Sequence, residues 1–140
     1  MDIDIDFKKP VFIVDDDQVI LSLLNAILRK IGFKDIREAL DGQKALVKIL
    51  AVDPCLIITD IDMPVMNGLQ LSQQVRRKRF FDRVPIIALT ANDTKEMVIR
   101  ALKSGIDSYL IKGEIKEEDV RNKIVEAFDY RRLKRCKTKP

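Results

Sequence analysis

Short apolar runs alternate along the chain with segments in which apolar residues recur every three or four positions. The runs lie at residues 11–14, 55–59, 84–89 and 109–111, with a weaker one at 36–40. Most are apolar at both odd and even positions, which is typical of strands buried on both faces of a parallel sheet. The pattern therefore predicts five strands.

The segments between and after these runs predict five helices. Their apolar stripes lie at residues 20–31, 45–50, 71–75, 98–102 and 120–128. Gly32 stands where the first helix should end, and Asp93 with Glu96 resembles a capping box before the fourth helix. Strands that alternate with helices predict an α/β domain with helices on both faces of a parallel sheet.

Acidic residues follow two of the predicted strands. Asp15, Asp16 and Asp17 follow the first, and Asp60 follows the third, with Asp62 two positions later. In an open sheet of order 2-1-3-4-5 the first and third strands are neighbours, and ligands bind beyond their carboxyl ends. We therefore expect Asp15, Asp16 and Asp60 to share one pocket. Helix capping explains Asp17, but it does not explain acidic residues at the ends of two separate buried strands.

Carboxylates gathered in one pocket repel one another, and a divalent cation relieves that repulsion. The chain contains no histidine, which removes the usual general base and the commonest transition-metal ligand. Ligands that are oxygen only favour Mg²⁺. Because Asp60 is alone at its strand end, it is the expected nucleophile, while Asp15 and Asp16 form a metal-binding pair.

Composition narrows the class of protein. A chain of 140 residues fits a single globular domain. Its net charge of +4 is uneven, with basic runs at residues 76–79 and 131–139. We interpret these runs as a helix C-terminus and a helix end or linker, because no aromatic residues interleave with them as in nucleic-acid-binding proteins. No apolar run approaches the roughly 20 residues of a membrane span, and the acidic start is unlike a secretory signal, so we expect a cytoplasmic protein.

Five segments in one register resemble the receiver domain of bacterial response regulators, as found in chemotaxis regulators. They are Val-Asp-Asp-Asp at 14–17, Ala-Leu-Asp-Gly-Gln-Lys-Ala-Leu at 39–46, Leu-Ile-Ile-Thr-Asp-Ile-Asp-Met-Pro-Val-Met-Asn-Gly at 56–68, Pro-Ile-Ile-Ala-Leu-Thr-Ala at 85–91, and Ser-Gly-Ile-Asp-Ser-Tyr-Leu-Ile-Lys at 104–112. The resemblance implies a flavodoxin-like, doubly wound sheet of order 2-1-3-4-5 with five helices. It places a receiver domain at residues 10–130, an N-terminal extension at 1–9 and a basic tail or linker start at 131–140.

The resemblance also implies roles for single residues. Asp60 would accept a phosphoryl group from a histidine of a sensor kinase or phosphotransfer protein, which makes the chain a switch rather than a turnover enzyme. The Mg²⁺ ligands would be Asp15, Asp16, Asp60 and the carbonyl of Asp62. The phosphoryl-binding and switch residues would be Thr90, Ala91, Lys112 and Tyr109.

The expected partners follow from the same resemblance. The switch surface around the fourth helix, fifth strand and fifth helix would control a downstream protein or a fused effector domain. A homodimer through the fourth and fifth helices stays open, as does the choice between a stand-alone receiver and a piece of a longer regulator. We expect neither direct nucleic-acid binding nor membrane binding by this domain.

Two departures from the family pattern and two rival functions remain. One departure is the acidic Asp62, two residues past Asp60, at a position that the resemblance associates with the lifetime of the phosphoryl group. Gly113 stands where the family usually has proline after the lysine, and we expect a trans Lys112–Gly113 peptide because a cis bond before a non-proline residue costs about 2.5–4 kcal/mol. The pair Asp60 and Asp62 also resembles the nucleophile motif of haloacid-dehalogenase-type phosphatases, but that motif belongs on a first strand. A degenerate receiver that serves only for docking is the second rival, and Gly113 is its one supporting feature.

Overall fold

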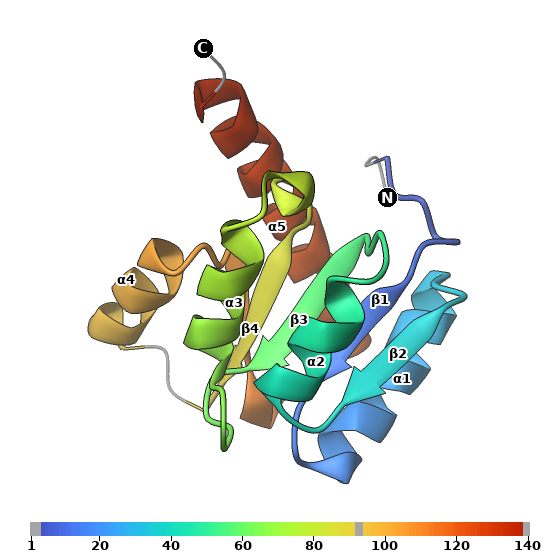
Figure 1. Ribbon diagram of the computed structural model, residues 1–140. Helices are drawn as coiled ribbons and strands as arrows, with labels where there is room; N and C mark the ends of the chain where they lie inside the picture. The colour runs from blue at the N-terminus through green and yellow to red at the C-terminus, as the bar shows by residue number, and fades with distance from the viewer. Residues whose placement is uncertain (1–3, 92–93, 139–140) are drawn as a thin grey trace.

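The computed structural model describes residues 4–91 and 94–138. Five parallel strands form one sheet in the order β2-β1-β3-β4-β5 (Figure 1). The strands are β1 (Val11–Val14), β2 (Ile36–Ala39), β3 (Leu56–Asp60), β4 (Ile86–Thr90) and β5 (Ser108–Ile111). The α-helices of the described ranges are α1 (Gln18–Ile31), α2 (Gly42–Ile49), α3 (Gly68–Arg76), α4 (Lys95–Lys103) and α5 (Glu117–Thr138). The predicted flavodoxin-like α/β fold is confirmed.

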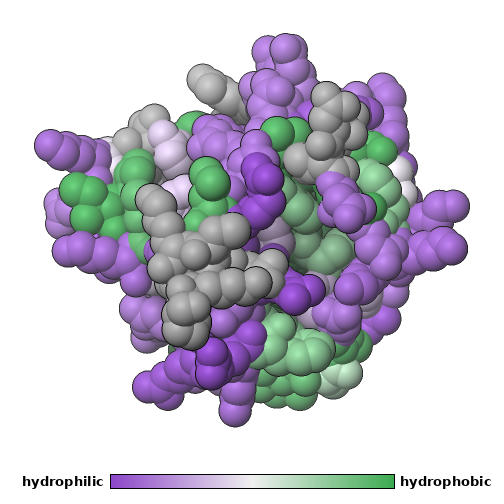
Figure 2. Space-filling model, turned by 90° about the horizontal axis from the view of Figure 1, so that it is seen from above, coloured by the Kyte–Doolittle hydropathy of each residue, from purple (hydrophilic) through white to green (hydrophobic). Residues whose placement is uncertain are grey.

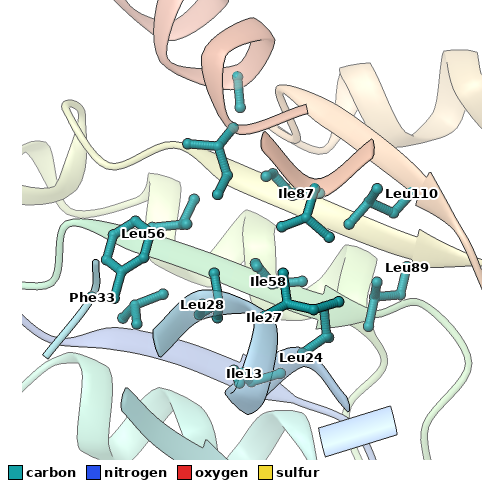
Figure 3. Close-up of a cluster of buried hydrophobic side chains, with 14 of the residues drawn as sticks. Ile13, Leu24, Ile27, Leu28, Phe33, Leu56, Ile58, Ile87, Leu89 and Leu110 are labelled. Atoms are coloured by element: carbon teal, nitrogen blue, oxygen red, sulfur yellow. The ribbon is translucent and has the colours of Figure 1, made fainter. Parts of the chain in front are cut away.

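The sheet separates two hydrophobic clusters, because alternate residues of a strand face opposite sides. Val11 and Ile13 of β1 lie in the cluster that also contains residues of α1 and α5, which Figure 3 shows. Phe12 and Val14 lie in the other cluster, with residues of α2, α3 and α4. All four β1 side chains are fully buried, which explains why this run is apolar at every position.

Two helix ends test the predicted capping signals. Gly32 follows α1 with a φ of 133°, a conformation that glycine adopts without steric strain, so the predicted end of this helix is confirmed. At α4 the side-chain oxygen of Thr94 accepts a hydrogen bond from the Met97 N–H, which makes Thr94 the N-cap. The predicted capping box of Asp93 with Glu96 is therefore wrong, since Met97 and not Glu96 occupies the third helical position; Asp93 itself lies outside the described residues.

The two ends of the chain pack more closely than the sequence indicates. Ile5 is buried, and the rings of Phe7 and Phe33 meet edge to face at 4.9 Å, so this part of the predicted N-terminal extension covers the first cluster. Helix α5 continues past residue 130, and Arg131 is buried with 8% of its surface exposed. Of the helices in residues 4–91 and 94–138, none is long and apolar enough to cross a membrane.

Cys55 is expected to resist alkylation. Burial raises the pKa of its thiol from 9.0 to about 12. Since the thiolate is the reactive form, its fraction at pH 8 falls by roughly three orders of magnitude relative to an ordinary thiol. Iodoacetamide labelling followed by peptide mass mapping should therefore show Cys55 reacting far more slowly in the native protein than in guanidinium chloride. Equal rates in the two conditions would contradict this environment.

Candidate functional site

The carboxyl ends of β1 and β3 bring three aspartates together. The two strands are parallel neighbours with Val14 opposite Thr59, so the residues that follow, Asp15 and Asp60, also lie side by side. A carboxylate oxygen from each of Asp15, Asp16 and Asp60 lies within 4.8 Å of the others. The predicted pocket of these three carboxylates is thus present at the carboxyl edge of the sheet.

Lys112 reaches the same pocket from the end of β5. Its ammonium nitrogen Nζ donates a hydrogen bond to Asp60 Oδ2 at 2.9 Å and lies 3.1 Å from Asp15 Oδ2. Burial lowers the pKa of Lys112, but its contacts with Asp60 and Asp15 outweigh that effect and leave the pKa raised. The lysine is therefore a fixed cation between two carboxylates. Its peptide bond to Gly113 is trans, as predicted.

Asp15 is the most deeply buried of the three carboxylates. Its residue surface is fully buried, and one oxygen, Oδ1, accepts a hydrogen bond from the Asp17 N–H at 2.9 Å. The other oxygen, Oδ2, has the ion pair with Lys112 but no partner of hydrogen-bond geometry among the described residues. Burial raises the pKa of this carboxyl, and repulsion from Asp60 adds to the rise.

This donor set fits a hard divalent cation. Three carboxylates gather here, and among the described residues Lys112 is the cation that pairs with two of them, so the pocket carries an excess of negative charge. All three offer oxygen ligands, the kind that Mg²⁺ prefers, and the buried Asp15 Oδ2 is an acceptor that a cation would satisfy. The residues present therefore suit Mg²⁺.

The segment between β3 and α3 holds Asp60 in place. The Asp62 N–H donates to Asp60 Oδ1 at 3.2 Å, while the Asp62 side chain is exposed. Gly68 packs so closely that a Cβ on it would lie 2.2 Å from the Asp60 carbonyl oxygen. Asn67 caps α3 in a reciprocal capping box with Gln70, which the sequence analysis did not identify. These contacts explain the glycine and the polar residues after the Met-Pro pair.

The segment at residues 39–42 supports the site from the side of β2. Asp41 caps α2 by accepting a hydrogen bond from the Lys44 N–H at 2.8 Å. The Gly42 N–H donates to the Met66 carbonyl at 3.3 Å, and a Cβ at Gly42 would lie 2.5 Å from that oxygen. The two loops therefore touch, and only glycine fits at their contact.

The remaining predicted residues lie on β4 and β5. Thr90 is the last residue of β4, is buried, and lies opposite Ile111 in the register of the two strands. Ala91 follows it and is exposed. Tyr109 on β5 is half-buried, and the ammonium of Lys123 on α5 lies 4.8 Å from the centre of its ring. Tyr109 therefore links β5 to α5.

The fold and this pocket define an α/β domain with a cluster of carboxylates at the carboxyl edge of its parallel sheet, and comparison with known proteins identifies the family. The model of the response regulator receiver domain matches residues 11–125, and the chain belongs to this family. Domains of this family are in general phosphorylated on an aspartate with Mg²⁺ and act as switches in two-component systems.

Individual proteins that resemble the chain are also chemotaxis regulators or receiver domains. The chain is 39% identical over 101 residues to the chemotaxis protein CheY1 of Helicobacter pylori, an alignment that covers 71% of this chain and 82% of that protein. The crystal structure of the chemotaxis response regulator CheY4 of Vibrio cholerae matches with a TM-score of 0.79 and 27% identity, covering 86% of this chain and 98% of CheY4. The receiver domain of a sensor histidine kinase from Pseudomonas aeruginosa, solved with a magnesium ion coordinated in its active-site cleft, matches with a TM-score of 0.77 and 26% identity, covering 87% and 98% of the two chains.

Proposed function

We propose that this receiver domain accepts a phosphoryl group on Asp60 from a histidine of a sensor kinase or phosphotransfer protein. The observation that carries the proposal is the hydrogen bond of Lys112 Nζ to Asp60 Oδ2, in a pocket that also holds Asp15 and Asp16. A carboxylate oxygen of Asp60 attacks phosphorus, the bond from phosphorus to the donor's imidazole nitrogen breaks, and that nitrogen keeps the electron pair.

The chain's own residues prepare this step. Asp15, Asp16, Asp60 and the carbonyl of Asp62 would hold Mg²⁺, which offsets negative charge on the phosphoryl oxygens when bound. Lys112 already lies beside Asp60 and would pair with a phosphoryl oxygen. The Thr90 hydroxyl and the Ala91 N–H supply further donors at the end of β4.

The response to phosphorylation would run through β5. A phosphoaspartate carries more negative charge than the carboxylate it replaces, so the Thr90 hydroxyl and Lys112 are drawn toward it. Tyr109 lies on β5, the strand that Lys112 directly follows, and contacts Lys123 of α5. A new Tyr109 rotamer would alter the surface of α4, β5 and α5, where a downstream protein, a fused effector domain or a second copy of the chain would bind.

Binding of Mg²⁺ followed by beryllium fluoride tests this function without a partner protein. In the ¹⁵N-labelled protein we expect Mg²⁺ to shift the amide signals of residues 15–17 and 60–62. Beryllium fluoride should then shift those of Thr90, Ala91, Tyr109 and Lys112. Signals that change equally without Mg²⁺ would contradict the proposed use of the metal.

Removal of the Lys112 charge is expected to tighten Mg²⁺ binding. In Lys112→Gln the carboxylates lose the cation that competes with the metal, and each lost ion pair is worth at most about 5–6 kcal/mol at this distance and an effective dielectric constant near 20. After solvent screening we expect roughly a tenfold lower Kd. The matched control is Lys34→Gln, an exposed lysine just before β2 at the opposite end of the sheet, which should leave the Kd unchanged. Weaker Mg²⁺ binding in Lys112→Gln would contradict this electrostatic account.

A further inference from the structure

A basic pocket of about 360 Å³ lies at the opposite end of the sheet from Asp60. Helix α3 begins beside Asp60 at Gly68 and ends at the pocket with Arg76, so the length of the helix separates the two sites. The charged residues that line it are five cations, Arg76, Arg77, Lys103, Arg131 and Lys134, and one carboxylate, Asp82. Figure 2 looks onto this end of the molecule, where hydrophilic residues lie among hydrophobic ones.

The floor of the pocket is a cluster of two guanidinium groups around one buried carboxylate. Arg76 Nη2 donates to Asp107 Oδ2 at 2.8 Å, and Arg131 Nε donates to Asp107 Oδ1 at 2.9 Å. The Asp107 side chain is completely buried, and the side chains of Arg76 and Arg131 are 13% and 9% exposed. Two nearly buried cations thus share a single negative charge.

This excess positive charge is unfavourable in the absence of an anion. A charge that is removed from water without a partner costs several kcal/mol. The single negative charge of Asp107 can neutralise only one of the two guanidinium groups. Burial lowers the pKa of Arg76 to about 10; attraction by Asp107 and Asp82 opposes this shift, and repulsion from Arg131 adds to it. The exposed cations above, Arg77 and Lys103, add to the positive potential rather than offset it.

Favourable interaction with helix C-termini is the competing explanation for these cations, since α3 and α4 both end here. It accounts for only part of the environment of Arg76. Its Nε donates at 3.0 Å to the carbonyl oxygen of Gly105, just beyond the end of α4, and its Nη1 donates at 2.9 Å to that of Phe81. A carbonyl oxygen carries no full negative charge, so these bonds do not neutralise the guanidinium group, which lines the pocket.

We propose that the pocket binds a small phosphorylated molecule with two or more negative charges. The guanidinium group matches phosphate in geometry as well as in charge. The volume lies in the range of small-molecule sites, about 300–1,000 Å³. The Gln73 amide, the Ser104 hydroxyl and the partly exposed Leu102 side chain offer contacts for an attached organic group such as a nucleoside.

The test uses the full ¹⁵N-labelled chain at low salt, titrated separately with inorganic pyrophosphate and with ADP in the absence of Mg²⁺. Either anion should shift the amide signals of Ser104 and Gly105. Tighter binding of ADP assigns the ligand to nucleotides, while equal binding shows that the phosphates alone are recognised. The variant Arg77→Gln/Lys103→Gln, which leaves the Asp107 cluster intact, should weaken binding at least tenfold.

Arg83→Gln is the matched control, because Arg83 is exposed one residue beyond Asp82 and does not line the pocket. It should bind both anions like the wild type. Three results would overturn the proposal: no response to either anion, equal weakening in the Arg83 variant and in the pocket variant, or a response to short duplex DNA alone. The pocket does not include Asp60, so none of these results bears on phosphorylation.

Discussion

Asp107→Asn is expected to lower the free energy of unfolding by about 3–5 kcal/mol, because it leaves two nearly buried guanidinium groups without a counter-charge. Asp107 Oδ2 also accepts a hydrogen bond from the Ile86 N–H at 2.9 Å, so the same side chain fixes the start of β4. Arg76 brings α3 and Arg131 brings α5 to this carboxylate. Loss of its charge therefore loosens three elements together, and urea denaturation would measure the effect.

Asp53→Asn is the matched control for this charge removal. Asp53 pairs with Lys9 at 2.9 Å, but the two side chains are 55% and 44% exposed. Ion pairs at such exposure contribute roughly 0–1 kcal/mol. Equal losses of unfolding free energy in the two asparagine variants would show that the Asp107 cluster stabilises the fold no more than an exposed ion pair does.

Gly68→Ala is expected to reduce both stability and phosphorylation. The new Cβ would lie 2.2 Å from the Asp60 carbonyl oxygen and 3.0 Å from the Ile61 Cα, and both are backbone atoms that no side-chain rotation moves away. We expect a loss of about 3 kcal/mol in the free energy of unfolding, at the upper end of typical overpacking effects. Because the displaced backbone carries Asp60, the proposed phosphoacceptor, the rate of phosphorylation should fall by roughly 100-fold.

The same substitution at Gly113 provides the comparison. A Cβ at Gly113 would have no atom within 4 Å, so Gly113→Ala should leave stability unchanged or raise it by about 0.4–1 kcal/mol. Urea denaturation and the rate of modification by acetyl phosphate, measured on both variants, separate a local clash from a general effect of adding a methyl group. Wild-type stability and phosphorylation rate in Gly68→Ala would contradict the expected clash and show that the segment between β3 and α3 can move to accept the methyl group.

The sequence predicts the fold and the carboxylate pocket because both depend on short-range patterns. Strands buried on both faces are apolar at every position, as β1 is. Once the strand order is known, Asp15 and Asp60 must be neighbours, because they follow paired residues of β1 and β3. Only the family resemblance predicts Lys112 at this site. In the structure its ammonium group pairs with both carboxylates.

The basic pocket depends on contacts that no local pattern contains. Asp107 lies 31 residues from Arg76 and 24 from Arg131, and nothing around each residue indicates the other two. Taken alone, Arg76 belongs to a basic helix end and Arg131 to a basic tail. Similarly, Ile5 and Phe7 lie in a polar context, and only the nearby first cluster explains their packing. Tertiary packing, which determines all of these contacts, is not visible in hydrophobic periodicity.

The central claim is that Asp60 is the phosphoacceptor, and intact-protein mass after incubation with Mg²⁺ and acetyl phosphate tests it most directly. We expect one phosphoryl adduct on the wild type that depends on Mg²⁺ and is absent from Asp60→Asn. Asp62→Asn, which alters an exposed carboxylate two residues away, should still form the adduct. An adduct that persists in Asp60→Asn, or a wild type that forms none and binds no beryllium fluoride, would contradict the account and favour a domain that serves only for docking.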